Sequence, residues 1–113
     1  VNGARDWIDE ETCLAAASGG HLTVLQWLRV NSFNWDARTC EMAAHGEHLT
    51  VLQWARANGC EWDARACFAA AESGHLAVLQ WARANGCDWD RDYCLDEAPV
   101  GTEPREWIQA QLV

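Results

Sequence analysis

Six cysteines and four histidines are the residues of this 113-residue chain whose types could bind a metal or carry redox chemistry. The cysteines form no Cys-x-x-Cys pair and no Cys-His group at zinc spacing. Most of these residues instead recur at a constant interval of 27 residues, namely Cys13, Cys40, Cys67 and Cys94, and His21, His48 and His75. Equivalent residues on stacked helices lie about 8–10 Å apart, too far for a disulfide or a shared metal. The spacing therefore predicts no metal site and no cofactor.

The cysteines are expected to fill space. Cys40 and Cys67 fall on an apolar helical stripe and should be buried, whereas Cys60 and Cys87 follow a helix end and should be partly exposed. A redox role at the latter two is the weaker alternative. Unpaired thiols favour a reducing intracellular compartment, either the cytosol or the interior of an organelle.

The histidines of the 27-residue interval are expected to organise loops by hydrogen bonding. The segment HGEH at 45–48 brings two histidines close together but lacks the HExxH pattern of zinc hydrolases. No Ser-His-Asp set, paired carboxylates or glycine-rich phosphate loop can be placed either. We therefore expect no enzymatic activity and no small-molecule substrate.

Charge narrows the class of partner. The formal net charge is −9, with four acids against one arginine in residues 1–13 and seven acids against two arginines in residues 88–106. Acidic ends repel a phosphate backbone, so no nucleic-acid partner is expected. No apolar run approaches the roughly 20 residues of a membrane span, so direct membrane insertion is not expected. After these exclusions, the expected partner is another protein or a multi-subunit complex.

The 27-residue interval organises the whole chain into a single predicted domain over 1–113. Its three full units are 9–35, 36–62 and 63–89, preceded by the end of another unit at 1–8 and followed by a C-terminal cap at 90–113. Each unit predicts two short helices, which we call the first and the second helix. Such a unit cannot bury its apolar face alone, so the units are expected to stack side by side. The predicted fold is all-α, with right-stacked helix-turn-helix repeats.

Particular residues predict where these helices begin and end. Asp36 and Asp63 should cap the first helices, and Asn58-Gly59 and Asn85-Gly86 should end the second ones. Pro104 predicts the first turn of a final helix in the tail, whose apolar residues would cover the end of the stack.

Tryptophan and arginine also recur at fixed positions. Six of the eight tryptophans occupy two positions and are expected in the core, namely Trp27, Trp54, Trp81 and Trp35, Trp62, Trp89. Trp7 and Trp107 are the two that could remain open to a partner. Arg29, Arg56 and Arg83 are expected on a solvated face, over tryptophan or paired with acids, and a docking stripe for carboxylates is the alternative.

The segment AAAESGHLAVLQWARANGCDWD resembles the ankyrin repeat, with the Ala-Ala-x-x-Gly-His-Leu turn of that family at 70–76. Two further copies in register extend the resemblance from about Trp7 to Trp89. It implies an ankyrin-like α-solenoid that binds proteins. The units are shorter than the usual 33 residues or so, and the β-turn finger is missing, so contact would use helix faces.

Positions that differ between units are the candidates for function. Two adjacent stripes of the first helices hold unlike residues, and we call them the first-helix strip: Leu14, Glu41, Phe68 and Leu95, with Ser18, His45, Glu72 and Pro99. Its apolar members suggest burial by a partner or contact with chain outside this sequence, and the alternative is a first helix that is more buried than assumed. The strip and Trp107 are the predicted partner-binding residues. The predicted function is a non-enzymatic protein-interaction module, and the alternative is a permanent structural or linker subunit of a larger assembly.

Overall fold

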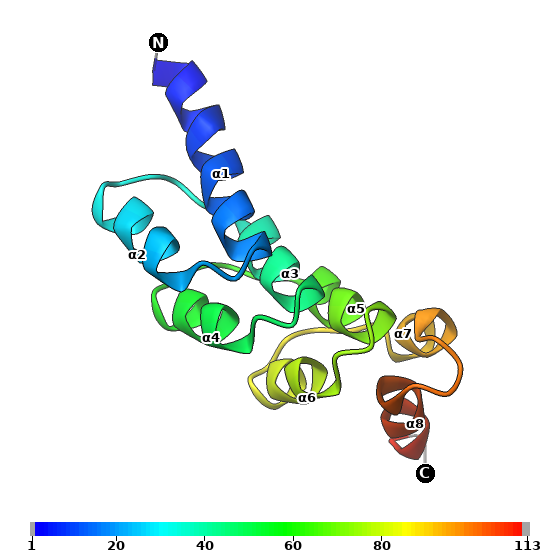
Figure 1. Cartoon of the computed structure of the whole chain (residues 1–113). Helices are drawn as coiled ribbons and strands as arrows, with labels where there is room; N and C mark the ends of the chain where they lie inside the picture. Colours follow the sequence, from blue (N-terminus) through cyan, green and yellow to red (C-terminus); the bar gives the residue numbers. More distant parts are fainter. Residues whose placement is uncertain (1, 112–113) are drawn as a thin grey trace.

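The computed structural model describes the backbone of residues 2–111 and the side chains of residues 10–111. Within residues 2–111 the regular secondary structure is all α-helix, joined by short turns and loops (Figure 1). Eight helices follow one another: α1 (Asn2–Ser18), α2 (Leu22–Val30), α3 (Ala37–His45), α4 (Leu49–Ala57), α5 (Ala64–Glu72), α6 (Leu76–Ala84), α7 (Arg91–Glu97) and α8 (Glu103–Ala110). The prediction of an all-α fold is therefore confirmed. None of the described helices is both long enough and apolar enough to cross a bilayer.

The predicted helix boundaries are confirmed in the middle of the chain. The carboxylate of Asp36 accepts the Arg38 backbone N–H at 3.0 Å, and that of Asp63 accepts the Arg65 N–H at 2.9 Å, so each satisfies a free donor of a first turn. At the other ends, α4 and α6 stop before Gly59 and Gly86, whose φ angles of 87° and 86° lie in the left-handed region.

The start of the chain differs from the expected pattern. Helix α1 runs without a break through Asp9, so no helix boundary follows residue 8. The reason is the pair of residues that precedes the expected boundary. Asn58-Gly59 stands before the Asp63 cap, whereas Ala4-Arg5 holds the equivalent place before Asp9. Alanine and arginine are strong helix formers, and neither favours a left-handed C-cap.

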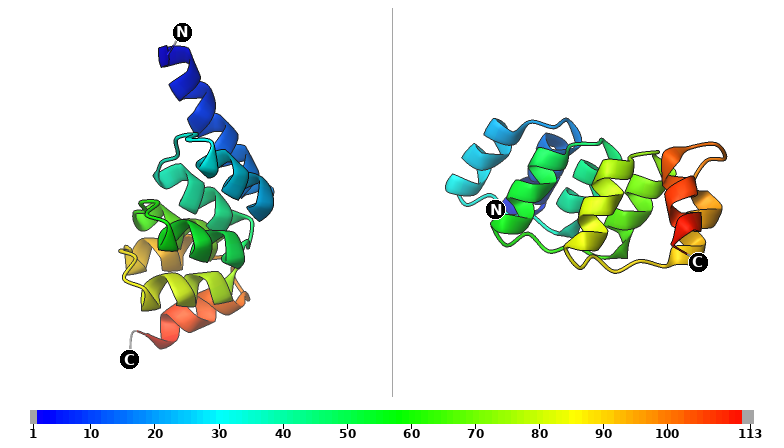
Figure 2. Two further views of the ribbon diagram at one scale, coloured as in Figure 1. Left: turned by 90° about the vertical axis from the view of Figure 1, so that its left-hand side faces the viewer. Right: turned by 90° about the horizontal axis from the view of Figure 1, so that it is seen from below.

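Small side chains bring together the first helices, which are α1, α3, α5 and α7; the second helices are α2, α4 and α6. Helix α3 packs between α1 and α5, and α7 packs on the other side of α5 (Figure 2). Fully buried alanines line these contacts, namely Ala17, Ala43, Ala44, Ala70 and Ala71. The second helices contribute the larger residues, with Leu25, Leu52 and Leu79 all fully buried. Burying each of these leucines contributes about 1.5–3 kcal/mol of stability.

The tail forms one more helix pair. The predicted final helix is confirmed as α8, with Pro104 in its first turn and Ile108 fully buried. Arg105 ties it to α7 by donating to the Leu95 carbonyl at 2.8 Å and the Ala98 carbonyl at 3.0 Å. Leu112 and Val113, which were also expected to cover this end, lie outside the described residues.

Candidate functional site

Tryptophan pairs line the second helices. Trp35 meets Trp54, and Trp62 meets Trp81, both edge-on with centroids 5.7 Å apart and an interplanar angle of 67°. The expectation that the six recurring rings are in the core is correct only in part, because five of them are partly buried and pack against the core, whereas Trp27 is 60% exposed. Leucine, valine and alanine already fill the interior, so the indoles close its edge.

An arginine side chain lies over the tryptophan that precedes each capping aspartate. The guanidinium carbons of Arg29, Arg56 and Arg83 lie 4.4, 4.5 and 4.7 Å from the ring centroids of Trp35, Trp62 and Trp89, respectively. Each arginine also donates to the backbone carbonyl four residues onward. The expected position over tryptophan is therefore confirmed, and these side chains are committed to local contacts.

Two histidines connect neighbouring first helices. The Nε2 of His48 donates to the Ser18 carbonyl at 3.1 Å, and that of His75 donates to the His45 carbonyl at 3.0 Å. Each bond satisfies a carbonyl at the C-terminal end of the preceding first helix. The predicted role in organising loops is confirmed for these two residues.

All six cysteines are free and buried. The expected partial exposure of Cys60 and Cys87 is wrong, because both are fully buried. Each thiol points inward and donates to the backbone carbonyl of the aspartate that caps the first helix of its own unit. The distance is 3.4 Å from Cys60 to Asp36 and 3.3 Å from Cys87 to Asp63. These bonds hold the segments that follow α4 and α6 against the N-terminal caps of α3 and α5.

The pKa values of these thiols are shifted in different directions. A hydrogen bond with Cys40, together with burial, raises the pKa of Cys60, and burial raises the pKa of Cys94 to about 11. In the pair of Cys67 and Cys87, the shared hydrogen bond raises the pKa of Cys67 and lowers that of Cys87. Within residues 10–111 no three His, Cys, Asp or Glu side chains are grouped so that they could hold a metal ion.

The first-helix strip combines exposed and half-buried side chains. Its polar stripe is exposed at Ser18, His45, Glu72 and Pro99, whereas the other stripe is half-buried at Leu14, Glu41, Phe68 and Leu95. Phe68 and Leu95 pack against the core, so the first helices are more buried there than a solvent-facing stripe would be. Trp107 does not join the strip, because it lies on α8 with its ring 5.9 Å from that of Trp89.

Tyr93 is the residue on this face that the sequence reading missed. Its ring stacks on Phe68 with centroids 4.8 Å apart and an interplanar angle of 20°, yet the residue is 51% exposed. The equivalent residues Thr39 and Ala66 are almost fully buried, because another first helix follows each of them. One large aromatic residue among small ones at this repeat position was the available signal.

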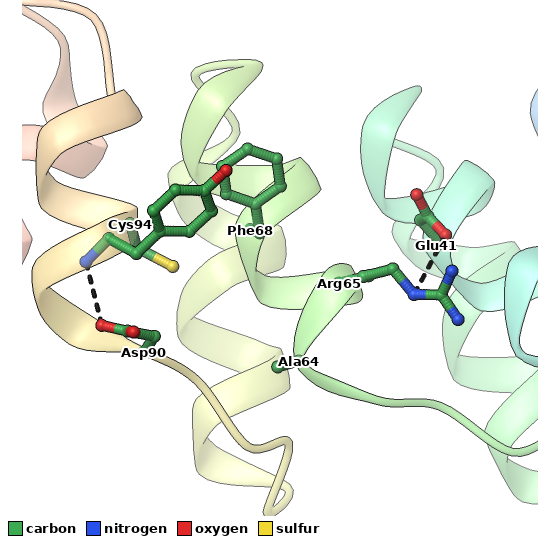
Figure 3. A pocket seen from close by; sticks show the side chains of 7 residues that line it. Glu41, Ala64, Arg65, Phe68, Asp90 and Cys94 are labelled. Carbon is green, nitrogen blue, oxygen red and sulfur yellow. Dashed lines mark hydrogen bonds and ion pairs between the residues drawn. The ribbon is translucent and has the colours of Figure 1, made fainter.

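A hollow of about 330 Å³ lies beside this aromatic pair, between α5 and α7 (Figure 3). Its lining residues are Glu41, Ala64, Arg65, Phe68, Asp90, Tyr93 and Cys94. Most of the exposed lining is apolar, and the three charged residues stand around it. It is the site on the first-helix face that could accept a side chain of a partner.

The charged residues of the hollow are held by their own contacts. Arg65 points away from Phe68 and toward Glu41, with its Nε 3.9 Å from the Glu41 carboxylate (Figure 3). Its Nη2 lies 2.9 Å from the Asp63 carboxylate, and this guanidinium lowers the pKa of Asp63. The Asp90 carboxylate accepts the Tyr93 backbone N–H at 3.0 Å. Arg65 is therefore held between two carboxylates, and Asp90 caps the start of α7 beside the aromatic pair.

Comparison with known proteins adds no family assignment. A scan against models of protein families found no match, and neither did a search of curated proteins. Geometry and chemistry of this chain therefore carry the functional argument.

Proposed function

We propose that this chain is a non-enzymatic protein-interaction module, built as an ankyrin-like α-solenoid, which binds another protein or a complex across its first-helix face. The observation that carries the proposal is the aromatic pair of Phe68 and Tyr93, which lies half exposed beside an apolar hollow. Large apolar side chains on an accessible face are typical of binding surfaces.

The divergence between copies supports the same face. Phe68 replaces the glutamate of the preceding unit, and Tyr93 replaces an alanine, whereas the tryptophan and arginine contacts of the second helices keep nearly the same geometry. Because Tyr93 is 51% exposed, half of this large side chain is not needed to fill the stack. The solenoid reading is supported by the constant 27-residue interval and by the consecutive packing of α1, α3, α5 and α7.

Affinity capture from cells of the source organism tests the proposal. The baits are the wild-type chain, Tyr93→Glu, Phe68→Glu and the control Ala84→Glu, which adds the same charge at an exposed position of α6. We expect the wild type and Ala84→Glu to recover the same partner, and Tyr93→Glu and Phe68→Glu to lose it. Circular dichroism verifies that each bait is folded. Equal recovery by all four folded baits contradicts the proposal.

A permanent structural subunit is the second candidate, and the edge of α2 favours it. Val24, Trp27 and Val30 lie three residues apart on this helix and are 50%, 60% and 83% exposed. The equivalent Val51 is only 3% exposed, so a neighbour that covers α2 would complete the pattern. Sedimentation of the purified chain separates the candidates, because a free-standing module stays monodisperse whereas an obligate subunit aggregates or pairs through this edge.

A further inference from the structure

The hollow between α5 and α7 combines an apolar floor with a negative rim. Ala64, Phe68 and Tyr93 provide the floor, and its volume of about 330 Å³ falls at the small end of ligand pockets. Glu41 and Asp90 stand at the rim together with Arg65, whose guanidinium is shared between Glu41 and Asp63, so the net charge of the rim is negative. A side chain with an apolar stem and a cationic head fits both features, since lysine and arginine bury their stems while their heads remain near water or acids.

The surroundings of the hollow have the same sign. Six carboxylates lie in the lining, the Asp63 cap and α7 with its cap, namely Glu41, Asp63, Asp90, Asp92, Asp96 and Glu97. Three arginines contact this region, and all are already engaged: Arg65 pairs with Asp63 and Glu41, Arg91 lies 3.6 Å from Asp92, and Arg105 donates to carbonyls at the end of α7. An acidic or neutral partner segment would leave these carboxylates without compensation, whereas a basic one complements them.

Tyr93 favours arginine over lysine. One face of its ring lies against Phe68, and the residue is 51% exposed, so part of the ring remains accessible to a cation. A planar guanidinium stacks on such a ring, whereas an ammonium is a compact and strongly hydrated charge. The chain makes this contact three times on its other face, where arginines lie 4.4–4.7 Å from tryptophan rings.

We infer that the hollow binds an arginine side chain of a basic partner segment, with the stem over Phe68, the guanidinium on Tyr93 and the charge near Glu41 and Asp90. This inference rests on the proposed function and specifies the class of partner. It makes Tyr93, Glu41 and Asp90 the residues that determine specificity on the first-helix face.

A peptide titration tests the inference. The probe is a fluorescein-labelled peptide with three arginines separated by Gly-Ser, and its matched controls carry lysine or glutamine in place of arginine. Binding to the intact chain is followed by fluorescence anisotropy at low salt. We expect the arginine peptide to bind, the lysine peptide to bind at least about twofold more weakly, and the glutamine peptide not to bind.

Protein variants locate the bound peptide. Tyr93→Leu keeps an apolar side chain but removes the ring, and we expect about a threefold loss of affinity. Glu41→Gln removes a rim charge and should cost a similar factor. The control Glu106→Gln removes the same charge from an exposed position on α8 and should change affinity by less than about 1.5-fold.

Three results would overturn the inference. Equal losses in Glu41→Gln and Glu106→Gln would mean that the peptide senses only the net charge of the chain. Equal binding of the glutamine peptide would mean that the hollow selects no cation, and equal binding of the lysine peptide would remove the selection of arginine. If the arginine peptide does not bind although Tyr93→Glu loses the captured partner, the proposed function stands and this inference alone fails.

Discussion

The two faces of the molecule treat repetition in opposite ways. On the second helices, the contact of Trp35 with Trp54 is repeated by Trp62 and Trp81 at the same 5.7 Å and 67°. On the first helices, one repeat position holds Leu14, Glu41, Phe68 and Leu95 in turn. The conserved geometry closes the edge of the core, so it is explained by stability. The divergent face packs against the core only in part and leaves Tyr93 51% exposed, so stability does not account for all of it, and this difference is why we propose the binding surface there.

The largest expected effect comes from the interior of a second helix. Leu52→Ala should lower the free energy of unfolding by about 3 kcal/mol, because Leu52 is fully buried and a cavity remains. Leu14→Ala, the same change at a half-buried position of the first-helix strip, should cost about 1 kcal/mol. Urea unfolding measures both. Equal losses would mean that the strip belongs to the core, and the contrast between the faces would disappear.

Two tryptophans at the same position of successive units should differ less in their contribution to stability. Trp54→Ala removes a partly buried indole and its edge contact with Trp35, so we expect a loss of about 2 kcal/mol. Trp27→Ala changes a residue that is 60% exposed and should cost less than about 1 kcal/mol. Thermal and urea unfolding of the two variants measure the difference. A larger loss for Trp27→Ala would show that something covers the edge of α2 in solution.

The smallest effect is expected at a helix cap on the first-helix face. Because Arg65 lowers the pKa of Asp63 in the folded chain, this carboxylate stabilises the fold above its unfolded pKa of about 3.9, and the contribution is lost as pH falls through the folded pKa. Asp63→Asn should therefore lose less stability than the wild type between pH 6 and pH 3. The difference should remain below about 1 kcal/mol because the pair is largely exposed. Parallel slopes for both proteins would show that the pair contributes nothing.

Local chemistry made much of the fold predictable from the sequence. The caps at Asp36 and Asp63 and the glycine ends of α4 and α6 depend on neighbouring residues alone, and all were placed correctly. The continuous α1 was missed because a constant interval was extended over Ala4-Arg5, where the turn residues are absent.

Burial was harder to predict than helix position. The exposure of Cys60, Cys87 and Trp27 was misjudged because exposure depends on which neighbouring unit covers a position, and this information is not local. The hollow posed the same problem. Phe68 was identified by its divergence, but its stacking on Tyr93 depends on α7 being the last first helix in the described structure, with none packed beyond it.

The most direct test of the central claim measures the affinity of the captured partner for single variants of each face. Isothermal titration calorimetry would compare the wild type with Tyr93→Glu on α7 and Ala84→Glu on α6. We predict that Tyr93→Glu weakens binding at least about tenfold, as expected for an aromatic anchor, while Ala84→Glu remains within about twofold. A partner that tolerates Tyr93→Glu but is lost with Ala84→Glu would contradict the account and move the binding site to the second helices.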